Sequence, residues 1–145
     1  MPATTRTDPY GRFNFLLEID GLVAAAFSEV SGLASETEVI EYREGSDKAN
    51  TVRKLPGLTK FSNLVLKRGV TPDKSLWNWR KTVTDGAVQR ANGSVVLLDE
   101  NHEEILRWNF YRAWPCKWEG PALNSKSSEV AIETLEITHE GLELA

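Results

Sequence analysis

The sequence predicts a mainly β fold, a β-barrel or sandwich of about six to eight short strands with one α-helix packed on it. Several segments alternate apolar and polar residues with a period of two, and turn-forming residues separate them. Only residues 73–85 carry apolar side chains at convincing helical spacing. With 145 residues, the chain is long enough for one domain with a substantial core.

The N-terminal part of the chain predicts an arm followed by a hairpin. Residues 1–12 are polar, and we expect a flexible arm ahead of a domain spanning 13–145. Apolar residues alternate over 13–20, which indicates a half-buried strand. Asp20-Gly21 is typical of a two-residue hairpin turn, so residues 23–27 are predicted to form the return strand.

A polar strand and a polar loop follow. Residues 35–43 look extended, but charged side chains occur at both parities, for example Glu36 and Glu41. Such a strand lies either where a sheet face meets water or at a sheet edge, where charge discourages unwanted pairing. Residues 44–53 form a ten-residue polar loop. Loops of this length in compact domains are often functional or ordered by a partner.

The middle of the chain predicts a turn, a strand and the single helix. Pro56-Gly57 is a turn signal, and the alternation after it predicts a strand over 61–67. Pro72 is suited to the first turn of a helix, because its missing N–H would have no partner there, so a helix is predicted over 73–85. If Gly57 or Gly69 adopts a positive φ angle, a valine there should harm the fold.

The C-terminal part predicts further hairpins. Asn92-Gly93 reads as a turn, followed by strands over 95–99 and 105–114. Pro115 donates no backbone hydrogen bond, so the strand must bend, bulge or lie at an edge there. A final strand is predicted over 127–139, either bulged or contacted on both faces, because its apolar parity shifts. The residues predicted to share one face of strand 105–114 are Leu106, Trp108, Phe110 and Trp114.

The sequence contains no grouping typical of catalysis, cofactor binding or metal binding. His102 and His139 lack a third ligand at a recognisable spacing, so we interpret both as surface histidines. The single cysteine, Cys116, has no local base and is expected to be a half-buried thiol rather than a nucleophile. Neither a dinucleotide-binding nor a phosphate-binding glycine motif occurs. We therefore predict that the protein is not an enzyme and holds no cofactor.

Charge and hydropathy narrow the functional classes further. Seventeen basic and twenty-one acidic residues give a net charge of −4, which argues against a protein that binds nucleic acid independently of sequence. The beginning of the sequence has no apolar segment typical of a secretion signal, and no window approaches a membrane span. We therefore expect folding in a reducing cytoplasm and no membrane anchor.

Two further surface features each allow two interpretations. Trp77 and Trp79 cannot both face the core fully, so either one of them covers a subunit contact or both lie partly buried in a local aromatic cluster. Lys67-Arg68 could bind phosphate, but a solvated strand end is the simpler interpretation. Strands that are polar on both faces, together with a long polar loop, are expected where another copy of the chain completes a sheet edge. We infer self-assembly.

Ordered segments of the sequence resemble the T4-like tail-tube family, which includes the inner-tube proteins of extracellular contractile injection systems. The resemblance spans residues 12–142 in order and at compatible spacing. The segments that carry it are FLLEIDG (15–21), AFSEVSGL (26–33), EVIEYREG (38–45), LPG (55–57), LVLKRGVT (64–71) and ETLEITHEG (133–141), with Trp79 in the helix.

The resemblance implies a β-barrel of two packed antiparallel sheets with a flanking helix, similar to the haemolysin-coregulated protein of type VI secretion. It implies hexameric rings stacked into a hollow tube, with a sheath, a baseplate or hub and a cap as partners and with protein or DNA as cargo. Three alternatives stay open: the tail tube of a DNA-delivering phage, a secreted ring carrier of the type VI kind, and a monomeric barrel that binds a small ligand.

The resemblance also assigns contact residues. The loop 44–53 is expected to reach a neighbouring subunit or ring, and the helix is expected to face the sheath. Lumen candidates are the polar positions of strands 35–43 and 61–68, with the inward parity undecided. The predicted inter-subunit contacts are Arg43, Glu44, Asp47, Lys48, Arg53 and Lys54, and the sheath-facing candidates are Asp73, Lys74, Asn78 and Lys81.

Overall fold

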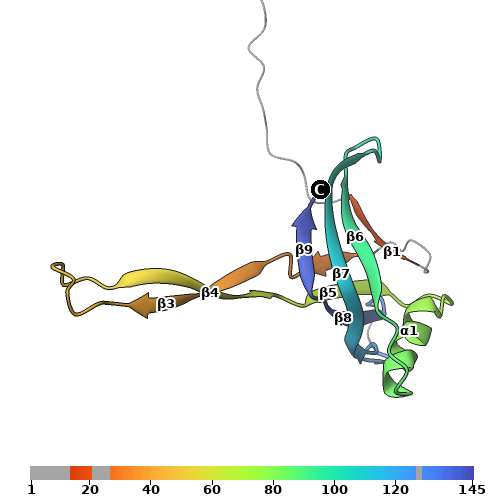
Figure 1. The fold of residues 1–145 in the computed structure, drawn as a ribbon. Helices are drawn as coiled ribbons and strands as arrows, with labels where there is room; N and C mark the ends of the chain where they lie inside the picture. The colour runs from red at the N-terminus through yellow and green to blue at the C-terminus, as the bar shows by residue number, and fades with distance from the viewer. Residues whose placement is uncertain (1–13, 21–26, 127–128) are drawn as a thin grey trace, which may run out of the picture.

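The computed structural model describes residues 14–20, 27–126 and 129–145. The predicted N-terminal arm and most of the predicted return strand over 23–27 lie outside these residues. Within them the chain forms nine strands and one helix (Figure 1), which confirms the mainly β fold. The elements are β1 (Phe15–Ile19), β2 (Glu29–Ser31), β3 (Ser35–Tyr42), β4 (Arg53–Phe61), β5 (Leu64–Gly69), α1 (Ser75–Thr84), β6 (Ala91–Leu98), β7 (Glu104–Glu119), β8 (Ile132–Thr138) and β9 (Gly141–Leu144).

Strand β7 belongs to both layers of the fold. Its first part pairs with β6, which in turn pairs with β1, and β9 pairs with β7 on the other side. Its last part, from Trp114 on, pairs with β8, which continues through β5 to β2. All these pairings are antiparallel. The 16-residue β7 therefore joins two antiparallel sheets that face each other.

A bulge at Arg112 allows β7 to change layers. Arg112 has a φ angle of 53°, and its backbone N–H donates to Asn92 Oδ1 at 3.0 Å. The pairing of β6 with β7 shifts register here, between Ala91 and Gly93. Because the bulge changes the alternation, Phe110 and Ala113 are both buried. The prediction that one face continues from Leu106 to Trp114 is therefore wrong beyond Phe110.

Asn92-Gly93 is not a turn, as the sequence had suggested, but part of β6. A Cβ atom at Gly93 would lie 2.5 Å from both the backbone oxygen of Glu18 and Cζ of Phe110. Glycine is needed there because β1 and the Phe110 ring approach the backbone closely. The true turn of this hairpin lies at residues 99–103, as predicted for the segment between the two strands.

Pro56-Gly57 is likewise not a turn, because both residues lie inside β4. Pro56 pairs with Val39, and the register with β3 shifts between Thr37 and Val39, so Gly57 and Leu58 form a bulge opposite Glu38. The chain instead breaks after Phe61, and the next strand is β5. Neither Gly57 nor Gly69 has a positive φ angle; among the described glycines, this conformation occurs at Gly32 and Gly86.

The helix follows the prediction to within two residues at each end. Asp73 accepts hydrogen bonds from the backbone and hydroxyl of Ser75 at 3.0 and 2.9 Å, which holds the start of α1. Gly86, with a φ angle of 80°, follows the C-cap residue Asp85. α1 is the only helix in the described part of the chain, and Leu76 and Trp79 bury its inner face.

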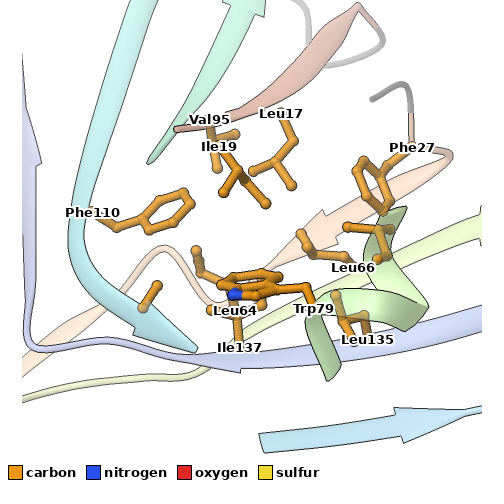
Figure 2. Close-up of a cluster of buried hydrophobic side chains, with 12 residues drawn as sticks. Leu17, Ile19, Phe27, Leu64, Leu66, Trp79, Val95, Phe110, Leu135 and Ile137 are labelled. Atoms are coloured by element: carbon orange, nitrogen blue, oxygen red, sulfur yellow. The ribbon is translucent and has the colours of Figure 1, made fainter. Parts of the chain in front are cut away.

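The core lies between the two sheets and under α1 (Figure 2). The prediction of one final strand over 127–139 is only partly correct: the described strand is β8, and β9 follows it. The pairing of β8 with β5 is regular, and the irregularity falls on β7 between Pro115 and Lys117, as the proline predicted. The labelled core side chains in Figure 2 are Leu17, Ile19, Phe27, Leu64, Leu66, Trp79, Val95, Phe110, Leu135 and Ile137.

Candidate assembly surface

Strands β3 and β4 form a hairpin that projects from the body of the molecule, away from α1 (Figure 1). We call this hairpin, residues 35–61, the β-arm. Among the described strands, β3 and β4 pair only with each other, and all eight residues of β3 are exposed. The strand polar on both faces that the sequence predicted over 35–43 is therefore confirmed as a water-exposed strand.

The β-arm exposes apolar side chains as well as charges. The register places Ile40 opposite Leu55, and their side chains are 49% and 45% exposed. Leu58 is 69% exposed and Val39 is 59% exposed. A two-stranded hairpin is only marginally stable in water by itself, and exposed apolar clusters mark interaction surfaces. The surface of the β-arm is therefore suited to a partner that covers it.

Opposite charges and hydroxyl groups also face each other across the β-arm. Glu36 lies opposite Lys60, and Glu41 lies opposite Lys54. Such cross-strand pairs favour the observed register. The hydroxyls of the Thr37–Thr59 pair are 3.0 Å apart. Lys54, a predicted contact residue, is thus placed on a strand of the β-arm rather than in its tip.

Asp47 organises the tip of the β-arm. Its Oδ1 forms an ion pair with Nη2 of Arg53 at 2.7 Å, and its Oδ2 accepts a hydrogen bond from the backbone of Glu44 at 3.0 Å. The guanidinium of Arg43 donates to the backbone oxygens of Asp47 and Ala49 at 3.0 and 3.2 Å. The structure thus brings together four of the six predicted contact residues as an internal network, and Lys48 lies exposed beside them.

The segments that flank the β-arm, residues 32–34 and 62–63, are anchored to the body, and we call them the root of the β-arm. The backbone N–H of Ser62 donates to Ala34 at 3.1 Å. The side-chain amide of Asn63 donates to Oε1 of Glu136 at 3.1 Å. A Cβ atom at Gly32 would lie 2.0 Å from the backbone oxygen of Asn63, so only glycine allows this approach. These contacts fix where the β-arm leaves the body.

His139 packs against the root, a contact that the sequence analysis missed. It is 8% exposed, and its two ring nitrogens lie near the carbonyl oxygens of Gly141 and Ser62. The prediction of a surface histidine is therefore wrong for His139 and correct for the exposed His102. The missed signal is its parity, since His139 continues the inward-facing positions of Leu135 and Ile137.

The sheath-facing candidates lie around α1, but they are not equivalent. Lys74, Asn78 and Lys81 are exposed on the helix or at its start. Asp73 instead binds Ser75 and lies 3.4 Å from Nη1 of Arg68. Hydrogen bonds from Ser75, first from its backbone and then from its hydroxyl, lower the pKa of Asp73, with a smaller contribution from Arg68. Asp73 therefore has a structural role.

Arg68 is not a solvated strand end. It is 6% exposed, and its Nε donates to Oε1 of Glu133 at 2.5 Å. Its guanidinium also lies 5.9 Å from the centre of the Phe27 ring. Arg68 thus joins β5 to β8 and to the start of α1. The side chain of its partner Glu133 is only 16% exposed.

The two helix tryptophans have different roles. Trp79 is 4% exposed and donates from Nε1 to the backbone oxygen of Gln89 at 2.8 Å. Trp77 is 46% exposed and packs edge-on against Trp118, with ring centres 4.8 Å apart. The alternative in which both are partly buried is therefore wrong for Trp79. A subunit contact at Trp77 stays a prediction.

The described side chains contain no arrangement that points to metal chemistry. They form no group of three or more histidine, cysteine or acidic residues that could bind a metal ion. Cys116 is half-buried, as expected, and burial, with a further contribution from Glu136, raises the pKa of its thiol. The described helix α1 is too short and too polar to cross a membrane.

The architecture defines a class of fold: two packed antiparallel sheets with a flanking helix and a projecting hairpin. The sequence model of the family described as T4-like virus tail tube protein gp19 matches residues 11–143. The chain belongs to this family. A comparison with curated protein sequences found no match.

Solved structures show the same fold. A chain of the anti-feeding prophage baseplate is 27% identical, with a TM-score of 0.86 and coverage of 97% of each chain. A chain of an extracellular contractile injection system, the PVC sheath-tube complex, is 23% identical, with a TM-score of 0.85 and coverage of 94% of this chain and 91% of that one. Hcp1 from Flavobacterium johnsoniae is 16% identical, with a TM-score of 0.59 and coverage of 90% and 94%.

Proposed function

We propose that the protein is the repeating subunit of the inner tube of a contractile phage-tail-like injection particle, in which hexameric rings stack around a hollow bore. Membership of the tail tube family supports this proposal. The observation that carries it is the β-arm, a surface of the monomer whose apolar side chains and paired charges have no cover within the described chain.

Another copy of the chain is the partner that this surface fits best. The β-arm is long, its tip is ordered by Asp47, and its strands expose Ile40, Leu55 and Leu58. Covering each of these half-exposed side chains would contribute about 1 kcal/mol. Head-to-tail contacts of this kind close into a ring when the rotation allows it, and stacked rings form a filament. The predicted role of the tip in contacts between rings is part of this proposal.

The structural comparisons favour an injection particle over a type VI ring carrier. The PVC and anti-feeding prophage chains have TM-scores of 0.83 to 0.87, whereas the similar Hcp chains have TM-scores of 0.54 to 0.59. The solved complexes include a sheath, a baseplate and a terminating cap. We propose the same classes of partner for this protein, with a protein effector or DNA as cargo in the lumen.

The proposal assigns the protein a structural and not an enzymatic role. Its family is one of tail tube proteins, and Cys116 and His139 both serve as packed structural side chains. We propose assembly in the cytoplasm, followed by release as part of an extracellular particle. The tail tube of a DNA-delivering phage is the second candidate, which the family description favours.

Analytical ultracentrifugation and electron microscopy of the purified full-length protein over a range of concentrations test the proposal. We expect hexameric rings or hollow tubes at high concentration, or after baseplate components are added to nucleate the assembly. A protein that stays monomeric at high concentration, with and without these components, would contradict the proposal. Packaged nucleic acid in native particles would favour the phage tail over the protein-injecting particle.

A further inference from the structure

A second exposed apolar surface lies on the body of the molecule, where β5 ends and β8 begins. Val70 is 51% exposed, Val130 is 75% exposed and Ile132 is 37% exposed. Ile132 pairs with Gly69, and the backbone N–H of Val70 donates to the backbone oxygen of Ala131 at 3.0 Å. The backbone pairing therefore holds the three apolar residues close together. We call Val70, Val130 and Ile132 the end patch.

The alternation of β8 explains why the end patch faces outward. Ile132 has the parity opposite to that of the buried Leu135 and Ile137, so it lies on the outer face of its sheet. Gly69, its partner on β5, has no side chain to cover it. A Cβ atom at Gly69 would lie 3.7 Å from Cγ1 of Val130, so Val130 lies over the glycine. Exposed apolar clusters of this kind mark interaction surfaces.

The end patch and the β-arm lie at opposite ends of β5. The β-arm ends at Phe61, and β5 begins at Leu64, whereas the end patch surrounds Gly69, the last residue of β5. The six residues of β5 separate its two ends by about 17 Å. The β-arm also projects away from α1, which follows β5 (Figure 1). The β-arm of a molecule therefore points away from its own end patch.

The root keeps the β-arm in this direction. The backbone of Ser62 donates to Ala34, and the side chain of Asn63 donates to Glu136 on β8. A β-arm anchored in this way cannot fold back over the body to cover the end patch. Each molecule thus carries one apolar projection and, at its other end, one apolar surface of matching character.

We propose that the end patch receives the β-arm of a second copy of the chain. This inference rests on the proposed function, in which the β-arm contacts another copy, and it names the surface on which the β-arm lies. The β-arm supplies Ile40, Leu55 and Leu58 to this contact. A contact between two different surfaces at opposite ends of one molecule is head-to-tail, so every copy in the assembly can use both of its surfaces.

Charges beside the two surfaces permit the contact. In the row of the outer sheet face next to the end patch, Lys67 lies between the acidic residues Glu29 and Glu119. On the β-arm, Glu41 lies opposite Lys54. Both surfaces are thus bordered by residues of both signs, so no strong repulsion opposes their approach. Apolar contact rather than ion pairing supplies the affinity.

Two double variants of the full-length protein test the contact by sedimentation. Val130→Ser, Ile132→Ser (the patch variant) removes the end patch and keeps the β-arm. Ile40→Ser, Leu55→Ser (the arm variant) does the reverse. We expect each variant alone to remain monomeric at concentrations where the wild type assembles. An equal mixture should form one-to-one pairs, because the intact β-arm of one variant meets the intact end patch of the other and growth then stops.

Two controls accompany the mixture. All the substituted side chains are exposed, so both variants should melt within a few degrees of the wild type. Val88→Ser removes an apolar side chain that is 37% exposed after α1, and it should assemble as the wild type does.

The outcomes separate this inference from the proposed function. The inference is overturned if the patch variant assembles like the wild type, or if the mixture stays monomeric while the wild type assembles. Pairs formed by the arm variant alone would show that the end patch binds another end patch, which also overturns it. Patch-variant tubes that form normally but no longer bind the sheath protein would assign the end patch to the sheath instead. A wild-type protein that is monomeric at every concentration would contradict the proposed function itself.

Discussion

Asp47 and Arg53 form an ion pair of 2.7 Å across the tip of the β-arm, although the side chain of Arg53 is 57% exposed and that of Asp47 only 14%. The carboxylate of Asp47 is thus shielded by the loop that it organises. The backbone of Glu44 donates to its other oxygen. The tip is therefore a shaped element at the far end of the β-arm, suited to contact another molecule in one conformation.

Deletion of residues 46–51 should separate folding from assembly. The segment contributes no side chain to the core, so we expect the free energy of unfolding of the monomer to change by less than about 0.5 kcal/mol. Stacking of rings should be lost. Denaturant unfolding and electron microscopy measure the two effects. Wild-type tubes formed by the deletion variant would show that the tip is not the contact between rings.

The double variant Ile40→Ser, Leu55→Ser tests the apolar surface of the β-arm. Both side chains are about half exposed, so the unfolding free energy of the body should change little, whereas assembly should be strongly reduced. A matched control is Thr37→Ser, Thr59→Ser, which keeps the paired hydroxyls of the same two strands. Equal sedimentation of the two double variants at high concentration would contradict the proposed interface.

Arg68→Met should destabilise the fold by about 3 kcal/mol, because it leaves the largely buried carboxylate of Glu133 without its cationic partner. Adding Glu133→Gln should recover much of this loss, since the unpaired charge is then removed. Denaturant unfolding of the single and double variants measures both changes. A double variant as unstable as Arg68→Met alone would show that the ion pair is not the cause.

The start of α1 should weaken in acid. The pKa of Asp73 lies below its usual value because Ser75 donates two hydrogen bonds to the carboxylate. The stabilisation is therefore present above the ordinary pKa of 3.8 and is lost as the pH falls through the lowered value. In Asp73→Asn, the free energy of unfolding should depend less on pH over this acidic range. Denaturant unfolding at several pH values measures this dependence. An unchanged acid slope in the variant would contradict this assignment.

Gly32→Ala should destabilise the protein by about 2 kcal/mol or more, because Gly32 has a φ angle of 97° and the new Cβ would meet the backbone of Asn63 at 2.0 Å. Gly45→Ala is the matched control, since its Cβ would meet nothing within 4 Å. Thermal unfolding compares the two. Equal melting temperatures would mean that the root of the β-arm tolerates a side chain at residue 32.

Local patterns in the sequence predicted the regular elements of the fold well. The strands of the β6–β7 hairpin followed from alternation, and α1 followed from Pro72 and the spacing of Leu76 and Trp79. The two turns that were predicted incorrectly share one cause. Pro56-Gly57 and Asn92-Gly93 both lie at β-bulges, where the chain continues as a strand and the dipeptide only offsets its register.

Local sequence patterns could not predict contacts between distant parts of the chain. The ion pair of Arg68 with Glu133 joins strands 65 residues apart, so neither residue carries a local sign of its burial. His139 did carry one, because it shares the inward parity of Ile137, but its partner Ser62 lies 77 residues away. The contact role of the 44–53 loop, which the resemblance to tail tube proteins implies, stays a prediction, whereas the internal network around Asp47 became visible only in the folded chain.

The most direct test of the account is a cryo-electron microscopy reconstruction of assembled tubes at side-chain resolution. We predict that the β-arm of each copy lies against a neighbouring copy, with Ile40, Leu55 and Leu58 removed from water and the Asp47–Arg53 ion pair retained at the tip. A tube in which the β-arms stay exposed to solvent, or fold back on their own subunits without touching another copy, would contradict the account.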